Sequence, residues 1–221
     1  MMAGLPLDYD SDPGRWLSHD LSWQVTGDVH NRVAELIESA GAAAEPIVDV
    51  GGGDGRLVTL LRSGTPSVVV DLSVAQLARA PHPKVRGSAA RLPLRSGTAG
   101  AAVMLWMLYH LDDPVQAITE AKRVLRPGGL FFASTASRRN DPELTDGYEA
   151  TGFDAEEAEE IVASVFDAVR VERWDGPLTH LPDREAVLRY CRSHLLPASA
   201  AERVAPPVWL TKRGCLVIAR S

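Results

Sequence analysis

The chain has 221 residues, which is enough for one domain with a sizeable hydrophobic core. Apolar residues make up 45% and charged residues 24% of the sequence, as in ordinary globular proteins. The net charge of −6 disfavours nucleic acid as a partner, and the longest apolar run, near residues 99–111, is too short and too interrupted to cross a bilayer.

The first forty residues divide into an arm and a helix. Residues 1–27 mix Gly, Pro, Asp and Ser with isolated aromatic residues, which predicts an arm rather than a regular element. Residues 28–40 carry apolar side chains at helical spacing, and Gly41 is a suitable helix end.

A glycine turn at residues 47–55 is the most specific feature of the sequence. It predicts a buried strand, a tight turn and a helix that begins at Arg56. Gly51 and Gly53 allow the backbone to approach a ligand closely because they carry no Cβ. Turns of this kind hold nucleotide-like cofactors at the edge of α/β sheets. Arg56 stands where a dinucleotide fingerprint needs its third glycine, and no P-loop Gly-Lys-Ser/Thr follows.

Further strands and helices alternate along the chain. The second apolar run ends at Asp71, about one βα unit (roughly 20 residues) after Asp49. Asp113 and Pro114 have the residue types of a helix N-cap and first helical position. Alternation through the first five strands predicts a parallel, doubly wound α/β sheet. The later elements are expected as strands at 84–87, 101–106, 130–134, 168–174 and 214–219, and helices after Ser73 and at 158–165 and 183–195.

The glycine turn resembles motif I of the class I S-adenosylmethionine-dependent methyltransferases, and residues 45–135 match that family's segments in order and spacing. The resemblance implies that Asp49 lies near the amino group of the cofactor and that the turn at 51–53 (Gly51, Gly52 and Gly53) walls the sulfonium. It also implies that Asp71 binds the ribose hydroxyls and that Leu72 packs near the adenine. An acidic lining suits the positive sulfur and ammonium, whereas it would repel a pyrophosphate. A plain helix cap is the alternative role for Asp71.

Two later segments extend the resemblance with departures. Residues 85–94 resemble the family's G-D-A-x-x-L-P-F segment, with Ser88 in place of the acid and Ala89 beside it. A serine hydroxyl can still accept a hydrogen bond from the adenine amine, although it carries no charge. Residues 101–114 resemble the family's fourth strand and following loop, with Ala101 and Tyr109 where the family has an acid and a histidine. At the end of that strand, Leu105 and Trp106 are candidate cofactor contacts, and core packing explains Trp106 equally well.

Catalysis is expected to rest mainly on alignment. Methyl transfer from a sulfonium is an in-line displacement, so the protein must orient the acceptor and exclude water. His110 follows the fourth strand and is a candidate general base because histidine titrates near neutrality, with a structural loop histidine as the alternative. Tyr9 is the best match for the arm aromatic that contacts the cofactor's carboxylate in many relatives. Residues 1–40 would then form a lid over the site within a single domain, 1–221.

The compartment follows from simple features. The N-terminus is polar and acidic, unlike a secretory signal, and Cys191 and Cys215 form neither a disulfide framework nor a zinc pattern. Scarce lysine beside arginine, with abundant alanine, indicates GC-rich coding. We therefore expect a cytoplasmic bacterial protein with no metal site and no membrane partner.

As a whole, the resemblance implies a Rossmann-like, seven-stranded, mostly parallel sheet whose last strand is antiparallel, with helices on both faces. The implied function is transfer of a methyl group from S-adenosylmethionine to a small-molecule substrate, which leaves S-adenosylhomocysteine. The short region after the fifth strand leaves no room for a separate recognition domain. An inactive S-adenosylmethionine-binding module, a Rossmann oxidoreductase and an RNA methyltransferase are the alternatives.

Overall fold

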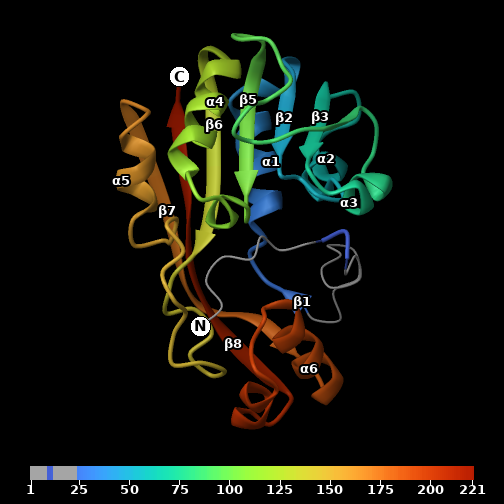
Figure 1. The fold of residues 1–221 in the computed structure, drawn as a ribbon, viewed down its shortest axis with the longest axis vertical. Helices are drawn as coiled ribbons and strands as arrows, with labels where there is room; N and C mark the ends of the chain where they lie inside the picture. Colours follow the sequence, from blue (N-terminus) through green and yellow to red (C-terminus); the bar gives the residue numbers. More distant parts are fainter. Residues whose placement is uncertain (1–8, 12–23) are drawn as a thin grey trace.

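The computed structural model describes residues 9–11 and 24–221 of the chain, and one sheet runs through it (Figure 1). The strands are β1 Gln24–Val25, β2 Ile47–Val50, β3 Ser67–Asp71, β4 Lys84–Arg86, β5 Ala99–Leu105, β6 Leu125–Ala136, β7 Ala168–Leu181 and β8 Val208–Arg220. The helices are α1 Val29–Ser39, α2 Arg56–Leu60, α3 Val74–Arg79, α4 Pro114–Val124, α5 Ala158–Ala163 and α6 Arg184–Ser193. Short 3₁₀ turns occur at η1 Ala42–Ala44, η2 Leu108–His110 and η3 Ala198–Arg203.

The sheet has the order β1-β7-β8-β6-β5-β2-β3-β4. Strands β4, β3, β2, β5 and β6 are parallel, whereas β8 is antiparallel to both β6 and β7. The predicted mostly parallel, doubly wound sheet is therefore confirmed, and its seven predicted strands are β2 to β8 of the eight-stranded sheet that the described residues form. The chain reverses direction across the sheet between β2 and β5, and such a switch point is where α/β folds bind ligands.

One short strand was not predicted. Gln24 and Val25 form β1, which pairs antiparallel with Thr179 and His180 of β7. The sequence-based expectation that residues 1–27 contain no regular element is wrong at these two residues. A two-residue edge strand has too little periodicity to be seen in the sequence.

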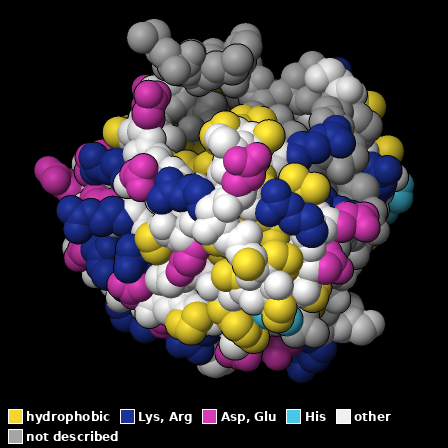
Figure 2. Space-filling model, turned by 90° about the horizontal axis from the view of Figure 1, so that it is seen from below, with side chains coloured by type: hydrophobic (Ala, Val, Ile, Leu, Met, Phe, Trp, Pro, Cys, Tyr) yellow, Lys and Arg dark blue, Asp and Glu magenta, His cyan; other side chains and the backbone are white. Residues whose placement is uncertain are grey.

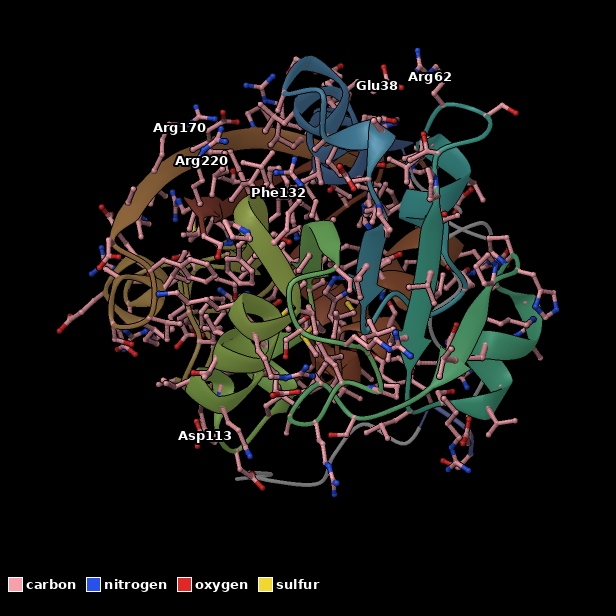
Figure 3. All side chains as sticks on the ribbon, turned by 90° about the horizontal axis from the view of Figure 1, so that it is seen from above. Glu38, Arg62, Asp113, Phe132, Arg170 and Arg220 are labelled. Atoms are coloured by element: carbon pink, nitrogen blue, oxygen red, sulfur yellow. The ribbon has the colours of Figure 1, made fainter. Side chains whose placement is uncertain are left out.

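Helices cover both faces of the sheet. Apolar residues of α4 and α5 pack with Val48, Met104 and Phe131 on one face. Residues of α1 and α2 pack with Ile47, Val103 and other strand residues on the opposite face. Figure 3 shows Glu38 and Asp113, from α1 and from the start of α4, on opposite sides of the molecule. Because side chains alternate along a strand, Asp49, which is two residues after Ile47, shares the face covered by α1 and α2.

Local capping fixes the helices next to the switch point. Asp28 accepts a hydrogen bond from the His30 backbone N–H at 3.0 Å, which caps α1, and it also pairs with Arg56 at the start of α2. Asp113 accepts from the Gln116 N–H at 3.0 Å and caps α4, as predicted. The Asp28 contact ties α1 to the helix that follows the glycine turn.

The hairpin β7–β8 extends far beyond the predicted strands. Both strands continue past the carboxyl ends of β3, β5 and β6 and carry α6 and η3 in a lower lobe (Figure 1). This lobe has its own apolar cluster, which includes Leu181, Val187 and Leu210. The expectation was that the region after the fifth strand leaves no room for a separate recognition domain; the lobe itself was not predicted, and it is continuous with the sheet through β7 and β8.

A buried carboxylate joins the lobe to the loop after β6. Asp141 accepts hydrogen bonds from the hydroxyls of Tyr148 and Tyr190, each at 2.9 Å, and from the Lys212 ammonium at 2.7 Å. Burial lowers the pKa of Lys212, while the charge of Asp141 opposes that effect. The Asn140 amide also donates to it, at 2.8 Å. Because these four donors satisfy it, Asp141 links the loop, α6 and β8 in one geometry.

Candidate functional site

The glycine turn between β2 and α2 is closely packed. Gly51 and Gly53 have φ angles of 65° and 56°, a left-handed backbone that favours glycine. A Cβ on Gly52 would lie 2.4 Å from the Asp49 carboxylate, and a Cβ on Gly51 would lie 2.9 Å from the Met107 side chain. Even one added carbon would therefore displace the groups that surround the turn.

Asp49 is a buried carboxylate beneath this turn. The residue is only 3% exposed, and its Oδ2 atom has no hydrogen-bond partner within the part of the chain that the structure describes. Burial, followed by the charges of Asp71 and Asp54, raises the pKa of Asp49 to about 7. Burial of an unpartnered carboxylate is costly, so a positively charged group beside it would be strongly stabilised.

Asp71 lies at the end of the neighbouring strand β3 and faces the same turn. Its two carboxylate oxygens accept hydrogen bonds from the backbone N–H groups of Gly53 and Ser73, both at 2.8 Å. Ser73 itself caps α3 by accepting from the Gln76 N–H at 3.1 Å, so the alternative role of Asp71 as the helix cap is wrong. Each oxygen of Asp71 retains capacity for another donor, such as a ribose hydroxyl.

The predicted adenine contacts lie close to Asp71. Leu72, directly after β3, is 57% exposed, so its side chain is open to a ligand. The Gly87 N–H donates to the Asp71 carbonyl at 3.0 Å, which brings the following segment alongside β3. In that segment, the Ser88 hydroxyl accepts from the Ala90 N–H at 3.2 Å, and Ala89 is buried. Leu72 and Ser88 thus lie next to each other at the carboxyl edge of the sheet, whereas Ala89 is part of the hydrophobic core.

At the end of β5 the chain takes an unusual path. Leu105 is buried in the core on the α1 face, and Trp106 has a φ of 58°, which is rare for a residue with a bulky side chain. The Trp106 ring meets the Trp174 ring of β7 edge to face, with centroids 5.9 Å apart. Neither the backbone of Trp106 nor its pairing with Trp174 was predictable from the sequence pattern.

The described part of the arm contacts two sides of this edge. The Tyr9 hydroxyl lies 3.4 Å from Nε2 of His110. The Asp10 carboxylate accepts from the Ser73 hydroxyl at 2.6 Å and from the Ala75 N–H at 2.9 Å. The arm therefore touches η2 on one side and the start of α3 on the other. Residues 1–8 and 12–23 of the expected lid lie outside the described residues.

The predicted residues thus gather at the carboxyl ends of β2, β3 and β5. A separate hollow of about 610 Å³ lies at the other end of these strands, between α1 and the loop after α2 (Figure 3), and it is lined by residues that include Glu35, Glu38 and Arg62. None of the residues predicted to bind cofactor lines this hollow. No helix among the described residues is long and apolar enough to cross a membrane.

Comparison with known proteins shows a likeness to methyltransferases. Residues 48–133 match the family model described as a methyltransferase domain. A protein of Mycolicibacterium smegmatis, named as a probable S-adenosylmethionine-dependent methyltransferase, is 32% identical over 52% of this chain and 54% of its own length. The ubiquinone/menaquinone biosynthesis C-methyltransferase of Caulobacter vibrioides is 30% identical over 49% of this chain and 51% of its own length. The chain spans about half the length of the curated relatives it matches.

A solved structure shares the fold. The YcgJ protein from Bacillus subtilis superposes with a TM-score of 0.64 at 16% identity, covering 88% of this chain and 99% of that one. At this identity the likeness concerns the fold alone. The matched residues 48–133 contain the glycine turn, Asp71 and the loop after β5. Sequence match, strand order and turn geometry agree: residues 48–133 match a methyltransferase domain, and the chain is similar to S-adenosylmethionine-dependent methyltransferases.

Proposed function

We propose that the protein transfers a methyl group from S-adenosylmethionine to a small-molecule acceptor. The observation that carries this proposal is the Oδ2 atom of Asp49, which is buried at the switch point beside the glycine turn and has no partner among the described residues. A cofactor with an ammonium and a sulfonium supplies the positive charge that this carboxylate lacks. A dinucleotide would instead bring a pyrophosphate next to Asp49, Asp54 and Asp71, all of which are acidic.

The donor site is assigned to three parts of the carboxyl edge. Asp49 holds the amino group, and the turn at 51–53 lies against the methionine chain. Asp71 binds the ribose diol through the lone pairs that Gly53 and Ser73 leave available. Leu72 and Ser88 flank the adenine, and the exposure of Leu72 supports that role because a planar base would cover it.

For methyl transfer, the main task of the protein is to align the donor and the acceptor. Bound S-adenosylmethionine supplies a methyl group that is already activated for displacement. The residues of η2 and the arm exclude water and orient the acceptor. His110 accepts a proton where the acceptor must lose one, and the Tyr9 hydroxyl, 3.4 Å from Nε2, orients the imidazole. Tyr9 also belongs to the proposed lid, residues 1–40, which covers the donor within a single domain.

Two observations support a small-molecule acceptor. The Caulobacter relative is named for quinone biosynthesis, which has small-molecule substrates. In addition, acidic and basic side chains are interspersed over the face seen from below (Figure 2), and the net charge is −6. A nucleic acid would instead favour a continuous basic surface.

Calorimetric titration tests the donor assignment. We expect S-adenosylmethionine and S-adenosylhomocysteine to bind with 1:1 stoichiometry, and NAD not to bind. Tight NAD binding without S-adenosylmethionine binding would overturn the proposal. Methyl transfer is tested by incubating the protein with S-adenosylmethionine and a panel of small hydroxyl, amine and thiol compounds, and following S-adenosylhomocysteine by mass spectrometry. Cofactor binding without turnover across the panel would favour the inactive binding module.

A further inference from the structure

The Trp106–Trp174 pair lies beside the proposed donor site and on the same face of the sheet. In the sheet register, Asp49 pairs with Val103 and Ser134 pairs with Leu105, so Ser134 is two strands and one side-chain row away from Asp49. That offset is about 10 Å across the sheet and about 7 Å along it. Trp174 lies one row further along and two strands further across, on β7 opposite Gly214. The pair is therefore placed for the acceptor rather than for the adenosyl group.

Small residues make room for the two indoles. Gly214 and Ala136 are paired on neighbouring strands in the row of Trp174. A Cβ on Gly214 would lie 2.5 Å from the Trp174 ring, so only glycine allows that ring to lie over β8 and meet Trp106. Both indoles are partly exposed. Two large aromatic rings thus stand over a floor of small side chains at the end of the sheet.

The backbone of Trp106 is held in a strained conformation. A φ of 58° is unfavourable for a tryptophan, and such strain persists where the surrounding structure imposes it, often at ligand sites. The Trp106 N–H donates to the Ser134 carbonyl at 3.2 Å, which fixes the residue to the end of β6. In this conformation the Trp106 ring lies against Trp174.

A second observation at the same place indicates a polar ligand group. The Ser134 hydroxyl is fully buried and has no hydrogen-bond partner among residues 9–11 and 24–221. Ser134 is two residues after Phe132 and opposite Leu216, so its side chain is on the α1 face, the face of the two indoles. Buried hydroxyls nearly always have a partner, and a polar substituent of a ligand would supply one.

We propose that Trp106 and Trp174 form the recognition wall for the methyl acceptor, and that the acceptor is a flat aromatic compound with a polar substituent that reaches Ser134. The proposal rests on the function proposed above. Aromatic rings attract one another in stacked and edge-to-face arrangements beyond the effect of buried area, so the wall discriminates flat aromatic from saturated molecules of equal size. The two indoles determine specificity and take no part in the proton transfer.

The test compares two probes on protein saturated with S-adenosylhomocysteine: 2-naphthol, and decahydro-2-naphthol as the saturated molecule of matched size. Calorimetry should show at least tenfold tighter binding of 2-naphthol. If S-adenosylhomocysteine itself does not bind, the proposed function fails at that first step. If it binds and the two naphthols bind equally or not at all, the aromatic wall is refuted while the donor site stands.

Variants assign the effect to residues. Trp174→Leu should reduce the preference for 2-naphthol to about twofold, and Trp174→Phe, which retains an aromatic face, should keep a larger part of it. Trp209→Leu is the matched control, because Trp209 lies on the same hairpin but is 46% exposed and stacked on His180. Unchanged affinity for S-adenosylhomocysteine shows that each variant is folded. Full preference in Trp174→Leu, or its loss in Trp209→Leu, would overturn the assignment.

The proposed contact between the ligand and the Ser134 hydroxyl is tested separately. Ser134→Ala removes a buried hydroxyl that has no partner in the part of the chain that the structure describes, so the thermal midpoint of the free protein should stay unchanged or rise. Binding of 2-naphthol should weaken about fivefold. Unchanged affinity for 2-naphthol in this variant would refute the contact with Ser134.

Discussion

Replacing Asp49 by asparagine tests the central electrostatic claim about the site. The ordinary aspartate pKa of 3.8 is raised to about 7 in the folded protein. That difference corresponds to about 4 kcal/mol, at about 1.4 kcal/mol for each tenfold change. Above pH 7 the carboxylate is ionised in both states, and the folded state bears this full cost. Below pH 4 it is protonated in both, and the cost vanishes.

The sign of the effect follows directly. Between pH 4 and pH 7 the folded protein retains a proton that the unfolded chain releases, so the free wild-type protein loses stability as pH rises through this window. Asparagine removes the charge, although its amide is also left without a partner, so we expect Asp49→Asn to recover about 2 kcal/mol at pH 8. For a chain of this size the midpoint then rises by about 4–8 °C, whereas at pH 4 it does not rise.

Thermal unfolding of the free protein at pH 4 and pH 8, with calorimetry of S-adenosylmethionine, measures both consequences. Asp49→Asn should weaken cofactor binding at least tenfold, and wild-type affinity should increase between pH 5.5 and pH 7.5 as Asp49 ionises. The control is Asp175→Asn, whose carboxylate is 65% exposed and pairs with Arg213. A lower midpoint for Asp49→Asn at pH 8, or an equal shift at both pH values, would refute the reasoning.

The remaining predictions concern single residues of the proposed site. Asp71→Ala should raise the dissociation constant of S-adenosylmethionine at least tenfold by calorimetry, and unchanged affinity would remove Asp71 from the ribose site. Gly52→Ala should abolish cofactor binding because its Cβ would lie 2.4 Å from the Asp49 carboxylate. The control is Gly176→Ala, which has open space for a Cβ and should bind the cofactor normally. Equal cofactor binding by the two variants would contradict the close packing of the turn. His110→Ala should lower turnover of an acceptor that must lose a proton about a hundredfold, and a change under threefold would leave alignment as the whole mechanism.

Local patterns were sufficient for the parallel half of the fold. Apolar runs, a glycine turn and the Asp113–Pro114 cap are local sequence signals, each of which indicates the structure of the residues next to it. The elements from β2 to α4 could therefore be predicted from the sequence. The hairpin β7–β8 could be only half predicted. Its outer part includes Asp175, Gly176 and Pro177, which break any apolar run, and cross-strand pairing within the hairpin maintains these residues as strand.

The candidate site likewise has a part that could be predicted from the sequence and a part that could not. The sequence carries Asp49 and Asp71 at the ends of consecutive strands, so their meeting at one edge could be predicted. Two features depend on distances between segments far apart in the chain: the lack of a partner for Asp49 Oδ2 among the described residues, and the pairing of Trp106 with Trp174. Ser134 gave no signal at all, since a buried serine without a partner looks in sequence like any strand residue.

Strand β8 also has a consequence for synthesis on the ribosome. It follows every other described strand along the chain, yet it lies inside the sheet between β6 and β7. A nascent chain that has emerged only as far as α6 can pair its parallel strands, but it presents the open edge of β6 to other molecules. Completion of the sheet therefore waits until translation has passed Arg220. An unpaired strand edge makes this unfinished chain prone to aggregation.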